Sequence, residues 1–183
     1  MQSKVVNVTI GSLLHDIGKV IYRGGDQRAH SLSGYEFIKE VLPEKSTLEC
    51  ILYHHWKDLA AAQIERSSPA YITYIADNIS AGTDRRESEG AEAGFDTYVP
   101  LASVFNILNN NKESFAYEAG TLEFSQGISF PVRSPKQYDP SFYNEIMQRL
   151  KDGLRAVSST GQYINSILEL FEGYLTYVPS STS

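Results

Sequence analysis

Histidine is confined to the first 55 residues of this 183-residue chain. His15 lies in the run 13–19, which reads Leu-Leu-His-Asp-Ile-Gly-Lys, so a carboxylate follows it directly. Imidazole nitrogens bind Zn, Fe, Ni, Cu and Mn-type ions, and carboxylates add oxygen ligands and offset the charge of the ion. We therefore expect one shared transition-metal site. Its candidate ligands are His15, Asp16, His30, His54, His55 and Asp77.

A metal site with this ligand mixture is suited to phosphoester hydrolysis. A divalent ion makes a water nucleophilic near neutral pH and stabilises developing charge on phosphate, and two ions about 3.5–4 Å apart suit in-line displacement. Asp16, with two carboxylate oxygens, could bridge such a pair. Adjacent helical residues diverge, so His54 and His55 can supply either one ligand or two.

Three basic residues near the His-Asp pair are candidate phosphate contacts: Lys19, Arg23 and Arg28. Lys19 lies about one helical turn after Asp16 and should point toward the site. We therefore group it with His15 and Asp16 as a catalytic residue.

The candidate ligands must be positioned by helices, because the apolar residues around them recur at helical spacing. One helix, with apolar positions from Ile10 to Ile21, should carry His15 and Asp16 and break at residues 24–26. A second should begin at His30 and reach about residue 41. A third, over about 48–56, should carry both His54 and His55.

A fourth helix should follow the Ser-Ser-Pro sequence at 67–69, with Asp77 beside its buried face. That face is predicted to hold Ile72, Ile75, Ala76 and Ile79, while Tyr74 has the spacing of a core residue. Farther along, we expect a short helix at 101–108, a β-hairpin within 114–132, and helices at about 140–157 and 161–174. The chain should thus be mainly α, with a small β-hairpin and a C-terminal helical annex.

Composition narrows the function classes. The net charge of −6 argues against a nonspecific nucleic-acid wrapper. One cysteine, Cys50, excludes an intramolecular disulfide and agrees with a cytoplasmic location. No apolar run approaches the roughly 18 residues that a membrane span needs, so we expect no membrane partner.

The chain resembles the HD phosphohydrolase superfamily, and more closely the N-terminal HD domain of the large, polymerase-like subunit of type III-A CRISPR effector (Csm) complexes. The His-Asp run carries the superfamily likeness, together with the His-Ser-x-x-Gly pattern at 30–34 and the pair at 54–55. The runs at 76–86 and 174–182 carry the narrower likeness, so the resemblance covers the whole chain.

This resemblance implies a metal-dependent nuclease that cuts single-stranded DNA, with Mn or Ni as the favoured ion and Co, Fe or Zn as others, bound singly or in pairs. It implies His15 and Asp16 as central ligands, completed by His30, by His54 or His55, and by Asp77. Lys19 would contact a phosphate or leaving group. Implied partners are the other subunits of a type III complex and a guide RNA, in antiviral defence.

The resemblance also suggests a division of the chain. Residues 1–86 would form the HD nuclease core, 87–99 a mobile acidic loop, and 100–183 an annex that leads to a Palm domain absent here, as in an expressed fragment. Two other functions stay open. One is an HD phosphohydrolase of nucleotides or cyclic dinucleotides, and the other is a catalytically inactive docking domain.

Overall fold

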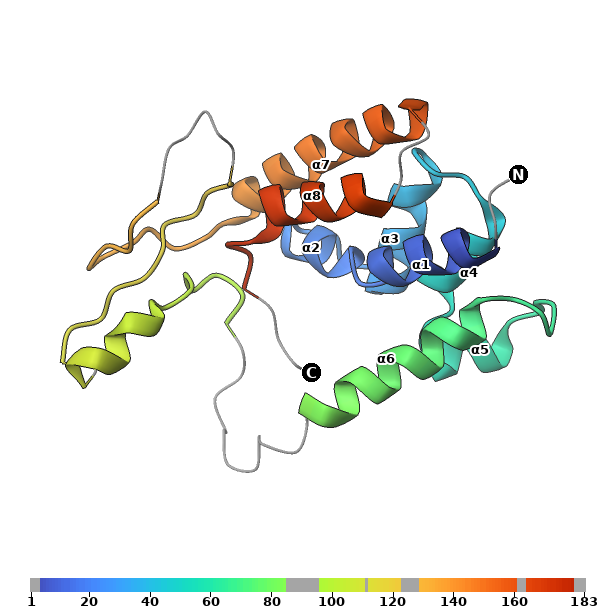
Figure 1. Ribbon diagram of the computed structural model, residues 1–183, viewed down its shortest axis with the longest axis horizontal. Helices are drawn as coiled ribbons and strands as arrows, with labels where there is room; N and C mark the ends of the chain where they lie inside the picture. Colours follow the sequence, from blue (N-terminus) through green and yellow to red (C-terminus); the bar gives the residue numbers. More distant parts are fainter. Residues whose placement is uncertain (1–3, 85–95, 111, 123–128, 161–163, 180–183) are drawn as a thin grey trace.

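The computed structural model describes residues 4–84, 96–110, 112–122, 129–160 and 164–179, and the predicted mainly α architecture is confirmed (Figure 1). The elements are α1 (Lys4–Leu14), α2 (Gly18–Arg23), α3 (His30–Lys39), α4 (Lys45–Leu52), α5 (Trp56–Ala61), α6 (Ala70–Asp84), the 3₁₀ helix η2 (Val104–Asn109), α7 (Pro140–Thr160) and α8 (Ile164–Leu175).

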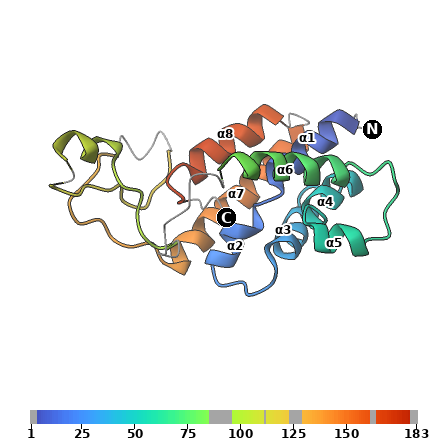
Figure 2. The ribbon, with the colours of Figure 1, turned by 90° about the horizontal axis from the view of Figure 1, so that it is seen from below.

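Most of the helices pack in two groups, α1–α4 and α7–α8, which share one hydrophobic core. α1 packs against α4, α2 against α3, and α3 against α4, while α7 lies along α8 and covers α2 (Figures 1 and 2). α6 lies across α4 and α1 and contacts the short helix α5. The histidine-bearing segments are therefore held between the α1–α4 group and α6.

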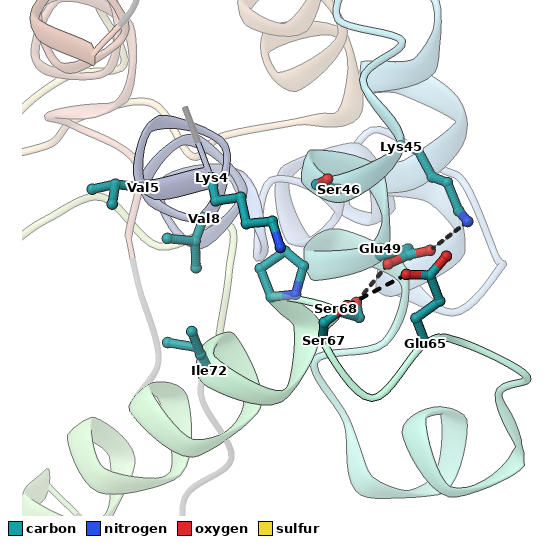
Figure 3. Close-up of a pocket in the computed structure, with 11 residues that line it drawn as sticks. Lys4, Val5, Val8, Lys45, Ser46, Glu49, Glu65, Ser67, Ser68 and Ile72 are labelled. Carbon is teal, nitrogen blue, oxygen red and sulfur yellow. Dashed lines mark hydrogen bonds and ion pairs between the residues drawn. The ribbon is translucent and has the colours of Figure 1, made fainter. Parts of the chain in front are cut away.

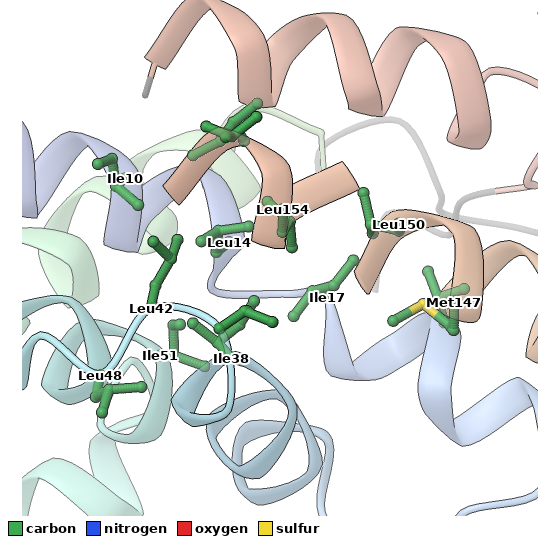
Figure 4. Close-up of a cluster of buried hydrophobic side chains, with 14 of the residues drawn as sticks. Ile10, Leu14, Ile17, Ile38, Leu42, Leu48, Ile51, Met147, Leu150 and Leu154 are labelled. Atoms are coloured by element: carbon green, nitrogen blue, oxygen red, sulfur yellow. The ribbon is translucent and has the colours of Figure 1, made fainter. Parts of the chain in front are cut away.

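A single apolar core joins the N-terminal helices to the C-terminal pair. Leu14 from α1, Ile38 from α3 and Ile51 from α4 are fully buried, and Leu150 and Leu154 of α7 fill the same cluster (Figure 4). Each such side chain contributes roughly 1.5–3 kcal/mol by leaving water. The helices at the end of the chain thus stabilise the same unit that positions the predicted site.

Two of the predicted helices end earlier than the apolar spacing indicated. The expected helix around His15 and Asp16 is two helices, because α1 ends at Leu14 and α2 begins at Gly18. The expected helix over 48–56 ends at Leu52, so His54 and His55 lie in the connection to α5. The prediction that these residues sit within helices was wrong, and the hydrogen bonds described below give the reason.

The predicted buried face of α6 was also wrong. Ile72, Ile75 and Ile79 are 59%, 55% and 67% exposed, whereas Ala70 and Thr73 are buried. Thr73 Oγ1 lies 3.0 Å from Ser12 Oγ of α1. α6 therefore approaches α1 through small side chains, which allow close helix packing, and its isoleucines face outward.

Between α6 and α7 the described chain is mostly irregular. The expected β-hairpin is represented by an antiparallel bridge between Ala116 and Val132, with a second bridge between Ala102 and Ala116. Residues 123–128, within the predicted hairpin, lie outside the described residues. The short helix expected at 101–108 is η2, and the two predicted C-terminal helices are α7 and α8.

The proposed division of the chain stays a prediction. Residues 85–95 lie outside the described residues, and they include most of the acidic loop predicted at 87–99. The described helices include none with the length and apolar character required to cross a membrane.

Candidate metal centre

The His15-Asp16 pair lies in the turn between α1 and α2. His15 Nδ1 lies 2.7 Å from the carbonyl oxygen of Ser12, in the last turn of α1. The last carbonyls of a helix lack intrahelical partners, so this side chain supplies a missing donor. Since a carbonyl only accepts, Nδ1 is the donor in this bond, and the neutral form of the ring then has its lone pair on Nε2. The bond that ends α1 therefore also prepares His15 as a ligand.

His54 repeats this arrangement at the end of α4. Its Nδ1 donates to the carbonyl oxygen of Ile51, 2.7 Å away, again three residues earlier in the chain. The imidazole is fully buried, and its Nε2 is left with a lone pair. A ring nitrogen bonded to a backbone carbonyl is the usual support of a metal-ligating histidine.

Three imidazole nitrogens converge beside the pair. His30, the first residue of α3, places its Nε2 at 2.8 Å from His55 Nε2 and 3.1 Å from His54 Nε2. The possible ligand atoms of these three residues lie within 4.8 Å of one another, so the group can hold a metal ion. The expected convergence of all three is therefore present, and both His54 and His55 take part.

Asp16 connects this group to His15. Its Oδ1 lies 3.4 Å from His30 Nε2 and 3.7 Å from His54 Nε2, while its Oδ2 lies 3.4 Å from His15 Nε2. Asp77, from the middle of α6, completes the cluster with Oδ1 at 3.5 Å from His15 Nε2. Asp16 thus presents one carboxylate oxygen to each side of the cluster.

The charges of the cluster suit metal ligation. Burial lowers the pKa of His54 to about 3, with a further contribution from His55, so this ring is neutral at neutral pH. Burial and His30 also lower the pKa of His55. Burial alone would raise the pKa of Asp16, but a hydrogen bond from His30 and the neighbouring His15 and Lys19 hold it well below its usual range. Neutral imidazoles beside an ionised carboxylate are the protonation states that a metal requires.

One buried atom indicates that the cluster fits a metal. His15 Nε2 is buried and has no hydrogen-bond partner among the described residues. A buried acceptor without a partner is costly, and a metal ion at this position would satisfy it. With the three convergent imidazoles and two carboxylates, this donor set fits a divalent transition metal.

A hollow of about 150 Å³ opens onto the cluster. Sequence reasoning missed part of its wall, because Trp56, Tyr74, Asn78 and Ala81 carry no ligand chemistry. They are brought there by the connection between α4 and α5 and by one face of α6. The lining residues are Asp16, Lys19, His54, His55, Trp56, Tyr74, Asp77, Asn78 and Ala81.

The three candidate substrate contacts have different environments. Lys19 lines the hollow, and its Nζ lies 2.8 Å from Asp16 Oδ2. Arg28 is half-exposed and pairs with Asp26 at 2.6 Å. Arg23 is buried, donates to the carbonyl of Pro179 and lies over the Tyr143 ring. The structure therefore brings Lys19 to the cluster, leaves Arg28 paired with Asp26, and holds most of the Arg23 side chain in the protein interior.

Lys19 also borders a second hollow of about 490 Å³. Arg28 and His30 line this hollow, together with Tyr22, Arg23, Gln27, Ala29 and Thr97. Lys19 therefore lines both hollows, and each hollow also has a histidine of the cluster in its wall.

A separate cavity of about 300 Å³ lies between α1, α4 and the start of α6 (Figure 3). Its carboxylates are already partnered: Glu49 accepts from Ser68 Oγ at 2.5 Å, and Glu65 accepts from Ser67 Oγ at 3.3 Å. None of the predicted site residues lines it. This cavity is therefore separate from the histidine cluster.

Comparison with known proteins agrees with this geometry. The HD domain family matches residues 2–82. The chain is 37% identical to the CRISPR system single-strand-specific deoxyribonuclease Cas10/Csm1 (subtype III-A) of Enterococcus italicus, over 98% of this chain and 26% of the relative. It thus spans about a quarter of that relative's length.

This chain is also similar to solved structures that contain Csm1. The crystal structure of Csm1 in T. onnurineus matches with a TM-score of 0.68 and 25% identity, over 100% of this chain and 26% of that one. The apo Csm1-Csm4 cassette matches with a TM-score of 0.63 and 25% identity, over 100% of this chain and 25% of that one.

Proposed function

We propose that this chain is a metal-dependent phosphodiesterase that cleaves single-stranded DNA, as its match to the HD domain family over residues 2–82 and its similarity to the Cas10/Csm1 proteins of subtype III-A suggest. The observation that carries this proposal is the convergence of four histidines and two carboxylates in one cluster, beside a hollow that Asp16, His54, His55 and Asp77 line. The relative from E. italicus is a single-strand-specific deoxyribonuclease, which supports this substrate.

We assign the cluster to two ligand groups. His30, His54 and His55 would hold one ion, and His15 with Asp77 would form a second set of donors. Asp16 faces both groups, with Oδ1 toward His30 and His54 and Oδ2 toward His15, so it is placed to bridge. We favour Mn or Ni, because imidazole and carboxylate ligands together suit ions of intermediate softness.

The remaining chemistry belongs to side chains around the cluster. When bound, a divalent ion supplies Lewis acidity that lowers the pKa of water and offsets charge on phosphate. Lys19 Nζ, 2.8 Å from Asp16, is placed to donate to a phosphate oxygen or to the departing oxygen. The carbonyls of Ser12 and Ile51 accept from Nδ1 of two imidazoles and so favour the tautomer in which Nε2 can ligate.

We further propose that this activity belongs to a type III CRISPR effector complex in antiviral defence, with other Csm subunits and a guide RNA as partners. The match to the Csm1-Csm4 cassette supports this assignment. The single cysteine, Cys50, is free and buried, which supports a reducing cytoplasmic location.

The test is a cleavage assay with the purified chain, Mn²⁺ or Ni²⁺, and matched single-stranded and duplex DNA. We expect metal-dependent loss of the single strand and an intact duplex, and cleavage at background level for the double variant His15→Ala, Asp16→Ala. Asp152→Asn, on the exposed side of α7, is the matched carboxylate control and should cut like the parent. Equal cleavage by the double variant would assign the activity to another site or protein.

The same assay separates the other hypotheses. A nucleotide or cyclic-dinucleotide phosphohydrolase would hydrolyse members of a nucleotide panel and spare DNA. An inactive docking domain would purify without metal and take up none. Lys19 and histidines of the cluster line two hollows, which favours an extended strand over a small ligand enclosed on all sides.

A further inference from the structure

We propose that Trp56 and Tyr74 form a stacking platform for one unpaired nucleobase beside the metal cluster. The inference rests on the proposed function, because it explains how the same site would select single strands. It concerns binding by two aromatic side chains that ligate no metal, so it can be tested without catalysis.

The two rings belong to the wall of the site. Trp56 follows His55 directly and begins α5, and Tyr74 lies one helical turn before Asp77 on α6. Both side chains line the hollow that contains His54 and His55. Their ring centroids are 6.0 Å apart, and the ring planes are inclined at 39°.

This geometry leaves an aromatic face open. Trp56 is 65% exposed, and the inclination of the rings prevents Tyr74 from covering it face to face. An indole left in water forgoes much of the stabilisation that burial would give it. Base–aromatic stacking suits such a face and accepts any base, because every base has a π-surface.

The position of the platform matches the chemistry of a single strand. Lys19 and Asp16 line the same hollow as Trp56, so a base on the indole brings its own backbone to the cluster. In a duplex the bases are already paired and stacked on each other, and unstacking one costs a few kcal/mol. The platform therefore favours binding of a strand whose bases are neither paired nor stacked on each other.

The surroundings favour a nucleobase over a protein partner. On α6, Tyr74, Asp77, Asn78 and Ala81 share one face at the spacing of about 100° per residue. The exposed isoleucines Ile72, Ile75 and Ile79 are on a different face. Trp56 therefore shares its hollow with polar groups of the site, Asp16, Lys19, Asp77 and Asn78, whereas the core of a protein interface is depleted in charged residues.

Trp56 is the only tryptophan of the chain, so its fluorescence reports on this platform alone. The metal-free 183-residue chain in EDTA would be titrated with a ten-nucleotide thymidine strand, an abasic strand of equal length, and a duplex. We expect quenching by the thymidine strand only. By fluorescence anisotropy of labelled strands, Trp56→Leu should bind thymidine DNA about 10- to 100-fold more weakly, and Trp56→Phe should keep most of the affinity.

A matched control lies far along the chain. Phe105 in η2 is 64% exposed, so Phe105→Leu removes an equally exposed aromatic ring and should bind like the parent. Equal affinity of the parent for thymidine and abasic strands, or unchanged affinity in Trp56→Leu, would overturn the platform. Self-association of the chain that requires Trp56, without quenching by DNA, would assign the ring to a protein interface and also overturn it.

The outcome is separable from that of the proposed function. If the chain cuts no DNA with any metal but still binds single strands through Trp56, the platform stands and the nuclease assignment fails. If the chain cuts single strands and Trp56→Leu cuts and binds like the parent, the nuclease assignment stands and the platform fails.

Discussion

The α-carbon of Gly18 lies against the backbone carbonyl of His30, so closely that a Cβ at position 18 would be 1.8 Å from that oxygen. The same Cβ would be 2.9 Å from the backbone nitrogen of Gly34. This approach presses the start of α2 against the start of α3. It fixes His30 beside Asp16 and His54, and only glycine permits it.

Gly18→Ala should therefore damage both stability and the metal site. Backbone atoms must move to relieve the contact, so we expect a loss of about 2–4 kcal/mol in the free energy of unfolding. Urea denaturation would measure it, and calorimetric titration of the still-folded variant with Mn²⁺ should show weakened binding as His30 is displaced.

Gly82→Ala is the control for this change. No atom lies within 4 Å of a Cβ at Gly82, which is exposed near the end of α6. Alanine there should leave metal binding unchanged and stabilise the protein by up to about 1 kcal/mol through helix propensity. Equal behaviour of the two variants would show that the α2–α3 contact does not position His30.

The metal-free protein should lose stability as the pH falls below about 6.5. The pKa of His54 is about 3 in the folded chain because the ring is buried, against 6.5 for an unperturbed histidine. Between these values the unfolded state binds more protons, so stability is full above pH 6.5 and decreases on acidification. Urea denaturation should show a loss of about 2 kcal/mol from pH 7 to pH 5.

The depressed pKa of His55 changes stability in the same direction. The lowered pKa of Asp16 also reduces stability on acidification, but only as the pH falls below the ordinary pKa range of a carboxyl group. His54→Asn keeps a side-chain donor for the Ile51 carbonyl and cannot titrate, so its stability should vary less steeply over the same range. An identical slope in the variant would show that the buried ring is not the source.

Substitution of Arg23 should reduce stability, whereas substitution of Arg28 should change substrate binding. Arg23→Ala removes a buried donor to Pro179 and the contact with Tyr143, so we expect a loss of about 2–3 kcal/mol in unfolding free energy. Arg28→Ala, on the surface, should change it by less than about 0.5 kcal/mol. In contrast, Arg28→Ala should reduce the salt dependence of single-strand binding.

Thermal denaturation and binding at several salt concentrations would check both variants. A destabilised Arg28→Ala with unchanged DNA binding would assign that side chain a structural role. An Arg23→Ala variant as stable as the parent would show that the buried guanidinium does not stabilise the fold.

Residue types predicted which side chains come together, but periodicity did not predict the local structure of the segments that carry them. Ile17 is buried although it lies outside a helix, so the apolar spacing continues through the turn that holds His15 and Asp16. The turn arises because the imidazole competes for the carbonyl of Ser12. His54 ends α4 in the same way at Ile51. Such capping depends on side-chain geometry that hydrophobic spacing does not contain.

The sequence also did not show which face of α6 is covered by neighbouring helices. The stripe of Ile72, Ile75 and Ile79 was correctly recognised as helical, but α6 packs through Ala70 and Thr73. Helical spacing identifies a face, and only the neighbouring helices decide whether it is buried. For the same reason the sequence could not show that Tyr74 lines the site and that Arg23 is buried.

Anomalous diffraction from a crystal of this chain loaded with Mn²⁺ tests the central claim most directly. We predict one or two peaks inside the cluster, about 2.0–2.3 Å from Nε2 atoms of the histidines, with Asp16 a ligand and Asp77 on the side of His15. Peaks only at other carboxylates, such as Glu49 and Glu65, or an empty cluster at saturating Mn²⁺, would contradict it.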